Sequence, residues 1–401
     1  MQFSDNKSGL RLLLSGLLPL FVLAHFGHHL LTALPIPLLP MIRSDFALDY
    51  TQSGWVVSAF NLAYGIGQLP GGWLTDRIGP RLMITIGICG VALAGFLVGL
   101  SHIFMLMIFF LALMGLLGGG YHPAAPPMIF ALVHPKVQGR ALGLHMVGGG
   151  ASFFLAPIIA MAIAASWGWR GSFIGLAVPT LIFGILFYVI LGKPKAAQQN
   201  DQGPSQAKEE EGLSSPGRVR GLIPFFVLST FTGAMVFAAT SFVPLFLVDQ
   251  FGFPKETAGI FYALIYSAGL WASPLGGYLS DRWGRVPVIL TVCFLSGPLI
   301  YLLNYAPSRW SIVLLLLAIG MIIYVRMPVS EAYIIRQTPV RNRSAVLGLY
   351  FFASMEGGGL LAPGMGYLID HLGFYYSFTI AGASLLLATL LSSIWLWGSR
   401  D

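Results

Sequence analysis

The chain has 401 residues, of which 56% are hydrophobic and only 9% are charged, and its mean hydropathy is +0.79. A soluble domain carries roughly 25% charged residues, so this composition excludes a chain of soluble domains and predicts a polytopic membrane protein. Its two cysteines, Cys89 and Cys293, lie in apolar runs and indicate no disulfide framework. Continuous apolar runs such as 312–323 favour helices, because a membrane β-barrel needs short alternating segments. The sequence therefore predicts an all-α fold.

Apolar runs separated by polar breaks predict twelve membrane-spanning helices. In chain order they cover residues 15–40, 51–75, 81–101, 103–132, 140–165, 171–191, 221–248, 256–280, 286–306, 309–335, 344–370 and 374–398. The first run is too long for the core of a signal peptide, so we expect it to remain as a span. Residues 193–220 are rich in Gln, Ser, Pro, Lys and Glu, which cannot bury a core. We predict an N-terminal six-helix bundle at 1–192, a disordered cytoplasmic linker at 193–220 and a C-terminal six-helix bundle at 221–401.

Lysine and arginine set the expected orientation in the membrane, because they concentrate in cytoplasmic loops. With the N-terminus inside, seventeen of the 22 Lys and Arg residues fall on the cytoplasmic side, and only four fall outside. Those four are Arg43, Arg170, Lys255 and Arg309. We therefore expect both termini in the cytoplasm. The net charge of +7 is explained by membrane insertion, and no nucleic-acid partner is predicted.

An internal repeat divides the chain into two copies. A shift of 205 residues, as from Asp76 to Asp281, aligns identical residues over most of each half. Further pairs are Phe26 with Phe231, Gly54 with Gly259, Gly72 with Gly277, Arg77 with Arg282, Gly79 with Gly284 and Pro123 with Pro328. One constant offset predicts two structural copies in parallel orientation, the arrangement of transporters whose two bundles rock against each other.

Two short motifs carry a family resemblance. Residues 72–81, GWLTDRIGPR, resemble the loop signature between helices 2 and 3 of the major facilitator superfamily, and residues 277–285, GYLSDRWGR, repeat it. The first half resembles the fosmidomycin-resistance branch of drug exporters at 23–25, 44–48, 121–123, 147–149 and 155–157. The resemblance implies two pseudo-symmetric six-helix bundles, transport by alternating access, and a multi-pass protein of the bacterial inner membrane. It also implies that helices 1, 4, 7 and 10 line the substrate cavity.

The charged residues of the two signature loops are the expected gate. Asp76 and Asp281 end helices 2 and 8, and a carboxylate is favoured at the positive N-terminus of a neighbouring helix by roughly 0.3–1 kcal/mol. The resemblance implies helix 11 as the neighbour of Asp76 and helix 5 as that of Asp281, in contacts made only while the cytoplasmic side is shut. We expect Arg77, Arg81, Arg282, Arg285 and Glu331 to complete this cluster, although simple topogenic charge is the alternative.

Two further ionisable residues lie deep in predicted spans, where such residues are costly and mark function. Arg326 of helix 10 presents a planar fork suited to a carboxylate, phosphonate or sulfonate, so we expect it in the substrate cavity. Glu356, twelve residues into helix 11, is the only carboxylate near mid-membrane and is the expected proton-coupling residue. A structural ion pair between Arg326 and Glu356 is the alternative for both.

Five histidines in predicted spans form a pattern. His25, His28 and His29 share one stripe of helix 1, while His122 lies on helix 4 and His145 near the start of helix 5. Imidazoles could relay protons or bind an anion, could ligate a transition metal, or could be buried hydrogen-bonding groups between helices. We assign all five to the substrate cavity and predict no resident metal or cofactor.

These features predict a transporter and not an enzyme. The chain has no HExxH motif and no nucleophile elbow. The expected function is proton-coupled export of a small organic anion or anionic drug, by a monomer in the lipid bilayer. The alternative is a proton symporter that imports an organic acid or a metal chelate.

Overall fold

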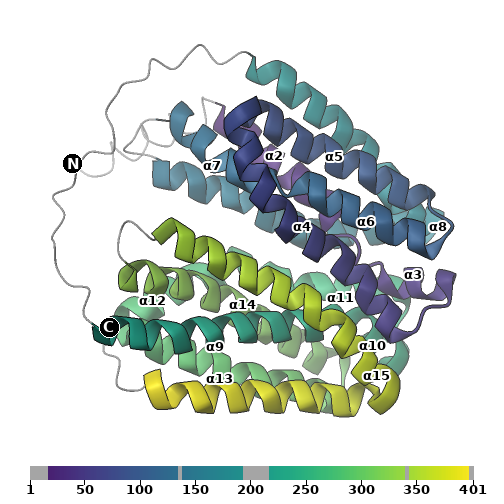
Figure 1. The fold of residues 1–401 in the computed structure, drawn as a ribbon. Coiled ribbons are helices and arrows are strands. Elements are labelled where there is room, and N and C mark those ends of the chain that lie inside the picture. Colours follow the sequence, from purple (N-terminus) through teal and green to yellow (C-terminus); the bar gives the residue numbers. More distant parts are fainter. Residues whose placement is uncertain (1–16, 134–137, 193–215, 339–342, 397–401) are drawn as a thin grey trace, which may run out of the picture.

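The computed structural model describes residues 17–133, 138–192, 216–338 and 343–396, and within these every regular element is a helix. Figure 1 shows two helical bundles that lie close together at the end formed by α3 (Leu39–Phe46) and α10 (Val243–Phe251) and diverge towards the opposite end. We call these the α3–α10 end and the signature end, because the second carries both signature loops. The all-α prediction is confirmed.

In the first bundle, two of the predicted spans are each divided into two helices, and two other predicted spans are joined in the single element α8 (Gln138–Leu191). Its elements are α2 (Leu18–Thr32), α3, α4 (Tyr50–Ile78), α5 (Pro80–Leu100), α6 (Phe104–Gly118), α7 (Tyr121–Leu132) and α8 (Gln138–Leu191). The predicted first span, 15–40, is interrupted after Thr32, because Pro35 and Pro37 cannot donate the backbone hydrogen bonds of a continuing helix. α8 consists of two helices that meet at Gly168, where φ is +68°.

The second bundle repeats this plan. Its elements are α9 (Pro216–Ser241), α10, α11 (Lys255–Ser267), η2 (Ala268–Leu270), α12 (Ala272–Trp283), α13 (Arg285–Leu302), η3 (Leu303–Tyr305), α14 (Arg309–Gln337) and α15 (Arg343–Leu396). α15 divides at Gly373, where φ is +74°, as α8 divides at Gly168. The positions differ by the 205 residues of the sequence repeat, and positive φ is readily adopted by glycine.

One predicted boundary is wrong. α9 begins at Pro216, inside the segment 193–220 that we expected to be linker, and proline is well suited to the first turn of a helix because it lacks a backbone N–H. The remainder of the predicted linker, 193–215, lies outside the described residues.

The helix count is consistent with twelve crossings. Seven described helices are long and apolar enough to span a membrane, and the bent pair α11–α12 makes eight. Two of the seven, with 51 and 49 residues, are about twice as long as the roughly 20 residues of one crossing, and each divides at a glycine. With the shorter apolar helix α2 and the 29-residue α4 added, the number of candidate crossings reaches twelve.

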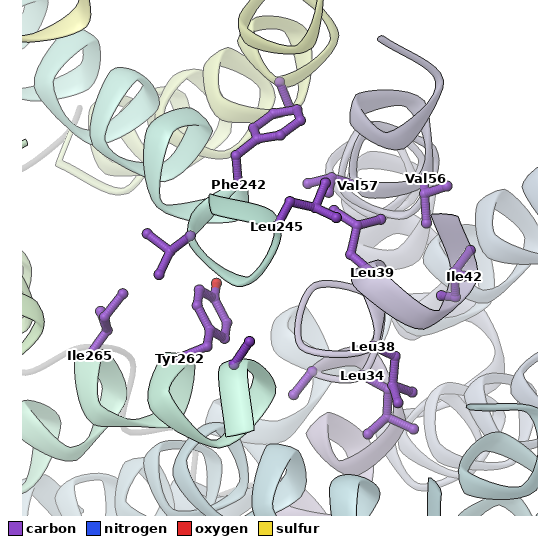
Figure 2. Close-up of a cluster of buried hydrophobic side chains, with 14 of the residues drawn as sticks. Leu34, Leu38, Leu39, Ile42, Val56, Val57, Phe242, Leu245, Tyr262 and Ile265 are labelled. Atoms are coloured by element: carbon purple, nitrogen blue, oxygen red, sulfur yellow. The ribbon is translucent and has the colours of Figure 1, made fainter. Parts of the chain in front are cut away.

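Three hydrophobic cores show how the bundles meet. One core lies within the first bundle and another within the second, both towards the signature end. The third crosses between the bundles at the α3–α10 end, where Figure 2 shows side chains from both halves converging. From the first half come Leu34, Leu38, Leu39, Ile42, Val56 and Val57, and from the second Phe242, Leu245, Tyr262 and Ile265. The halves are therefore sealed by a shared core at this end.

Candidate functional site

Five histidine rings cluster between α2, α7 and α8 in the first half. The stripe predicted on the first helix turns three rings towards the rings from α7 and α8. The closest pair, His25 and His145, is stacked with ring centroids 4.2 Å apart, and His25 also contacts His29 at 4.9 Å and His122 at 5.2 Å. His28 contacts His29 at 4.8 Å. All but the half-buried His122 are buried.

Hydrogen bonds through Nδ1 hold three of these rings in fixed orientations. His25 Nδ1 lies 2.8 Å from the carbonyl oxygen of His145, and His145 Nδ1 lies 3.1 Å from that of Phe21. His29 Nδ1 lies 3.1 Å from Thr32 Oγ1. The cluster is thus a built arrangement of oriented imidazoles, in which His122 makes no hydrogen bond with any described residue.

Two tyrosines that sequence reasoning missed complete this cluster. Tyr121 of α7 stacks on His28 with centroids 4.3 Å apart and on His25 at 5.6 Å. Tyr64 of α4 places its hydroxyl 3.1 Å from His28 Nε2. Both phenols are buried. Tyr121 directly precedes His122 in the sequence, and this position was a signal for it. Nothing in the sequence pointed to Tyr64.

Arg326 is the centre of a polar site in the second half. Its side chain is buried, and Nη1 donates to the carbonyl oxygen of Ser229 at 2.7 Å, to Ser229 Oγ at 3.0 Å and to the Tyr350 hydroxyl at 3.1 Å. Nε and Nη2 make no hydrogen bond with any described residue. A methyl group at Gly233 would lie 2.7 Å from Nη2, so the glycine makes room for the guanidinium.

The histidine cluster and the arginine site are equivalent under the repeat. The 205-residue shift places Tyr121 on Arg326, His28 on Gly233 and His145 on Tyr350. In the first half the Tyr121 ring stacks on the His28 ring. In the second half the Arg326 guanidinium fills the space that Gly233 leaves open. The two halves therefore present chemically different groups, aromatic imidazoles and a cation, at matching positions.

Glu356 does not pair with Arg326 in the described structure. Its side chain is buried and points across the interface to α4 of the first half, where a methyl group at Gly65 would lie 1.5 Å from Oε1. Oε1 has no hydrogen-bond partner among the described residues. The alternative of a structural Arg326–Glu356 ion pair is thus not what these residues form.

Glu356 lies at the inner end of a long seam between α4 and α15. Towards the α3–α10 end, Ser58 Oγ donates to the carbonyl oxygen of Gly359, and a methyl group at Gly54 would lie 2.6 Å from Ala362 O. Small residues let the two backbones approach closely, as is usual for helix pairs in membranes. The seam joins the two bundles.

The outer end of this seam is closed by a carboxylate. Asp370 of α15 accepts hydrogen bonds from the backbone N–H of Tyr50 at 2.9 Å, and from the N–H and hydroxyl of Thr51 at 2.8 and 2.6 Å. The first N–H groups of a helix have no partner within it, and Asp49 of the same half accepts from Gln52 N at 2.6 Å. Asp370 therefore caps α4 from the opposite bundle.

A second polar contact crosses the bundles at the same end. Arg43 of α3 pairs with Asp249 of α10 at 2.5 Å, and the Tyr50 hydroxyl donates to the same carboxylate at 2.6 Å. The guanidinium of Arg43 lies 4.1 Å from the centroid of the Tyr50 ring. Shared core, seam and ion pair all close the α3–α10 end.

The residues of the expected gate lie at the signature end. Asp76 and Asp281 are exposed, and neither takes part in an ion pair between described residues. Arg77 stacks on Trp73 at 3.8 Å, and Arg81 on Tyr188, also at 3.8 Å, while donating to its carbonyl oxygen. These contacts stay within the first half.

The second-half members of the expected gate are similarly placed. Arg282 donates to the Tyr278 hydroxyl of its own helix at 3.3 Å, and Arg285 is half-buried at the start of α13. Glu331, half-buried on α14, interacts electrostatically with Arg326. The gate contacts with helices 5 and 11 belong to a state in which this end is shut, and they stay a prediction.

This architecture defines a class of protein: an all-helical membrane protein of two related bundles that meet at a shared hydrophobic core. The chain belongs to the Major Facilitator Superfamily, whose family model matches residues 21–271 and 225–401. It is a multi-pass secondary transporter and not an enzyme.

Individual relatives and structures are similar along nearly the whole chain. The fosmidomycin resistance protein of Escherichia coli is 24% identical over 89% of this chain and 87% of its own. The hexuronate transporter of Bacillus subtilis is 25% identical over 88% and 87%. A bacterial homologue of the human lysosomal transporter Spinster, crystallised in an inward-facing and occupied conformation, superposes with a TM-score of 0.77 at 15% identity, covering 95% of each chain, and so shares the fold.

Proposed function

We propose that the protein exports a small organic anion in exchange for protons. The names of the relatives support this substrate class and direction: one is a transporter of hexuronate, an organic anion, and the other confers resistance to the drug fosmidomycin. The site supports it through two buried ionisable groups, Arg326 and Glu356, which serve different purposes.

The observation that supports an anionic substrate is that the buried charge of Arg326 forms no ion pair with a described acid. A guanidinium keeps its charge under all relevant conditions, and burying a charge is costly unless it is paired. Only neutral oxygens bond its Nη1, and Glu331, which interacts with it electrostatically, forms no salt bridge with it among the described residues. Nε and Nη2 form one edge of the fork, the geometry that binds a carboxylate, sulfonate or phosphonate with two hydrogen bonds. An anionic substrate supplies the missing charge.

Glu356 supports the coupling to protons. A buried carboxylate without a hydrogen-bond partner is far more costly than the neutral acid, and Oε1 has no such partner in the described seam. Closure of the seam therefore favours the protonated acid, and loss of the proton favours reopening. Opening the α3–α10 end separates Glu356 from Gly65 and gives the carboxyl access to water, where it can exchange its proton.

The orientation of the chain assigns the two ends. The distribution of Lys and Arg supports a cytoplasmic signature end, with the α3–α10 end facing outward. On this assignment the structure is closed to the outside and represents the state that takes up an anion from the cytoplasm. The outside-open state loads Glu356 with a proton, and antiport requires that this proton be released to the cytoplasm while the signature end is open, before the anion is carried out.

This proposal is tested by measuring uptake of an anion into proteoliposomes under two pH gradients of opposite direction. The membrane potential is held at zero with potassium and valinomycin, and the probes are radiolabelled hexuronate and fosmidomycin. Antiport predicts accumulation when the lumen is acidic, because protons leaving the lumen drive the anion in. Accumulation only with an alkaline lumen would replace export by proton symport, that is, import of an organic acid. Equal accumulation under both gradients would refute proton coupling.

A further inference from the structure

Three of the clustered histidines have the geometry of a metal site. His25 and His29 lie one turn apart on α2, and His122 faces them from α7. One donor nitrogen from each lies within 4.8 Å of the other two. His25 and His29 are more than nine-tenths buried, so these nitrogens converge inside the protein.

The hydrogen bonds of His25 and His29 fix which nitrogen carries the proton. A carbonyl oxygen can only accept, so His25 Nδ1, 2.8 Å from the oxygen of His145, must be the donor. The Thr32 hydroxyl donates to the carbonyl oxygen of His29, and its own oxygen therefore accepts from His29 Nδ1. In both neutral rings Nε2 is left with a free lone pair. This is the arrangement by which proteins orient metal-binding histidines, with the second nitrogen bonded to an oxygen.

We propose that His25, His29 and His122 bind one divalent transition-metal ion of the class Co²⁺, Ni²⁺, Cu²⁺ or Zn²⁺. Imidazoles suit these ions, whereas Mg²⁺ and Ca²⁺ require oxygen ligands. At a Zn–N distance of about 2.0–2.1 Å, the nitrogens of a tetrahedral site lie about 3.3 Å apart. The three nitrogens, all within 4.8 Å of one another, must move closer to reach that spacing when an ion binds.

Three neutral imidazoles leave the ion with its full charge and with an open coordination position. An anionic fourth ligand is therefore favoured, and the carboxylate of an organic acid provides one. This second step rests on the proposed function, because it makes the transported anion the fourth ligand. The metal site itself does not depend on it.

Titration of the purified full-length protein with Co²⁺ tests the site, since the visible absorption of Co²⁺ intensifies on tetrahedral coordination. The protein carries an affinity tag without histidines. One saturable ion is expected, and His29→Ala or His122→Ala lowers the affinity at least a hundredfold. His102→Ala and His371→Ala are the matched controls, because both residues are exposed and lie outside the cluster; they leave binding unchanged.

A subtler variant tests the orientation of His29. Thr32→Val keeps the size of the side chain but removes the oxygen that accepts from Nδ1. Loss of such a supporting contact typically lowers metal affinity 10–100-fold, and that loss is expected here. Thr180→Val, which removes a buried threonine hydroxyl bonded within its own helix, is the control and leaves binding unchanged.

Electron paramagnetic resonance of Cu²⁺ bound to the unaltered protein provides a test that needs no variant. Hyperfine splitting from three nitrogens is expected, and its absence overturns the proposal, as does Co²⁺ binding that survives the combined replacement of His25, His29 and His122. Adding hexuronate to the Co²⁺ form separates the two steps. A change in the absorption supports the anion as fourth ligand, whereas an unchanged spectrum removes that step and leaves the metal site. Uptake of hexuronate in metal-free buffer tests the proposed function independently.

Discussion

The Arg326 guanidinium is bonded to the described residues through Nη1 alone. The shape of the guanidinium therefore matters as well as its charge. Ser229 and Tyr350 bond Nη1 and aim the rest of the fork. Lysine would keep the charge but has no second edge for a bidentate anion. The permanent charge and the fixed direction together make this residue the expected anion contact.

Arg326→Lys should therefore weaken anion binding at least tenfold, equivalent to about 1.4 kcal/mol, with folding preserved. Ligand-induced stabilisation of the purified protein measures this, since a ligand that binds only the folded state raises the melting temperature. Arg309→Lys, an exposed position on the same helix, is the control. Unchanged stabilisation by hexuronate and fosmidomycin in Arg326→Lys would reduce the arginine to a point charge or a structural residue.

The Glu356 carboxyl packs against Gly65 of α4, and this contact can be tested separately. A methyl group at Gly65 would lie 1.5 Å from Glu356 Oε1, so Gly65→Ala must displace the carboxyl or part the seam. We expect gradient-driven transport to fall several-fold relative to substrate exchange. Gly364→Ala on α15 is the control, because its methyl group would meet nothing within 4 Å. A ratio of the two fluxes that does not change in Gly65→Ala would argue against coupling at this contact.

At the scale of elements, the seam between α4 and α15 is the feature that holds the outer end shut. Its glycines allow close approach, and its outer end is fixed by Asp370 capping a helix of the other bundle. Capping hydrogen bonds contribute roughly 0.5–2 kcal/mol, and here that stabilisation is lost whenever the bundles part. Asp370 therefore favours the state closed at the α3–α10 end.

Asp370→Ala should shift the protein towards the state open at that end by about fivefold or more, because 1 kcal/mol already changes a population by that factor. The rate at which a thiol reagent reaches Ser58→Cys in the seam reports the shift. Asp49→Ala removes a cap on the same helix from within the same bundle, and should leave the rate unchanged. Equal acceleration in both variants would show that only the helix end has frayed.

The sequence predicted the helices far better than their contacts. Hydropathy predicted helices in the segments where the structure has them, and the prolines at 35 and 37 could have predicted the break after Thr32. The cap by Asp370 joins residues 320 positions apart. A lone acid at a helix end carries no signal of such a partner, so the contact needed the structure.

At the scale of the whole molecule, the two halves are copies that differ where the chemistry lies. The structure shows glycine breaks at Gly168 and Gly373, which are related by the 205-residue repeat. The histidine stripe and Arg326 were identifiable because ionisable residues are rare in spans. Their equivalence under the repeat became visible only through Tyr121 and Tyr350, which composition does not distinguish from other aromatic residues.

Rocking of the halves predicts opposite changes of distance at the two ends. Spin labels at Trp73→Cys and Tyr278→Cys report the signature end, and labels at Ser44→Cys and Gln250→Cys report the α3–α10 end, all at exposed positions. The native Cys89 and Cys293 are first replaced by Ala. Shifting the population to the outside-open state should shorten the first distance and lengthen the second. If both distances lengthened together, the bundles would be separating and not rocking.

Glu356→Gln tests the central claim most directly, because it removes the titrating group with little change in volume. Proteoliposomes are assayed for hexuronate and fosmidomycin in two ways, as accumulation driven by an acidic lumen and as exchange of labelled for unlabelled anion without a gradient. The account predicts that exchange survives, since it needs only anion binding and rocking, while gradient-driven accumulation is abolished. Full gradient-driven accumulation by Glu356→Gln would contradict the account and move proton coupling to His25, His29 or His122.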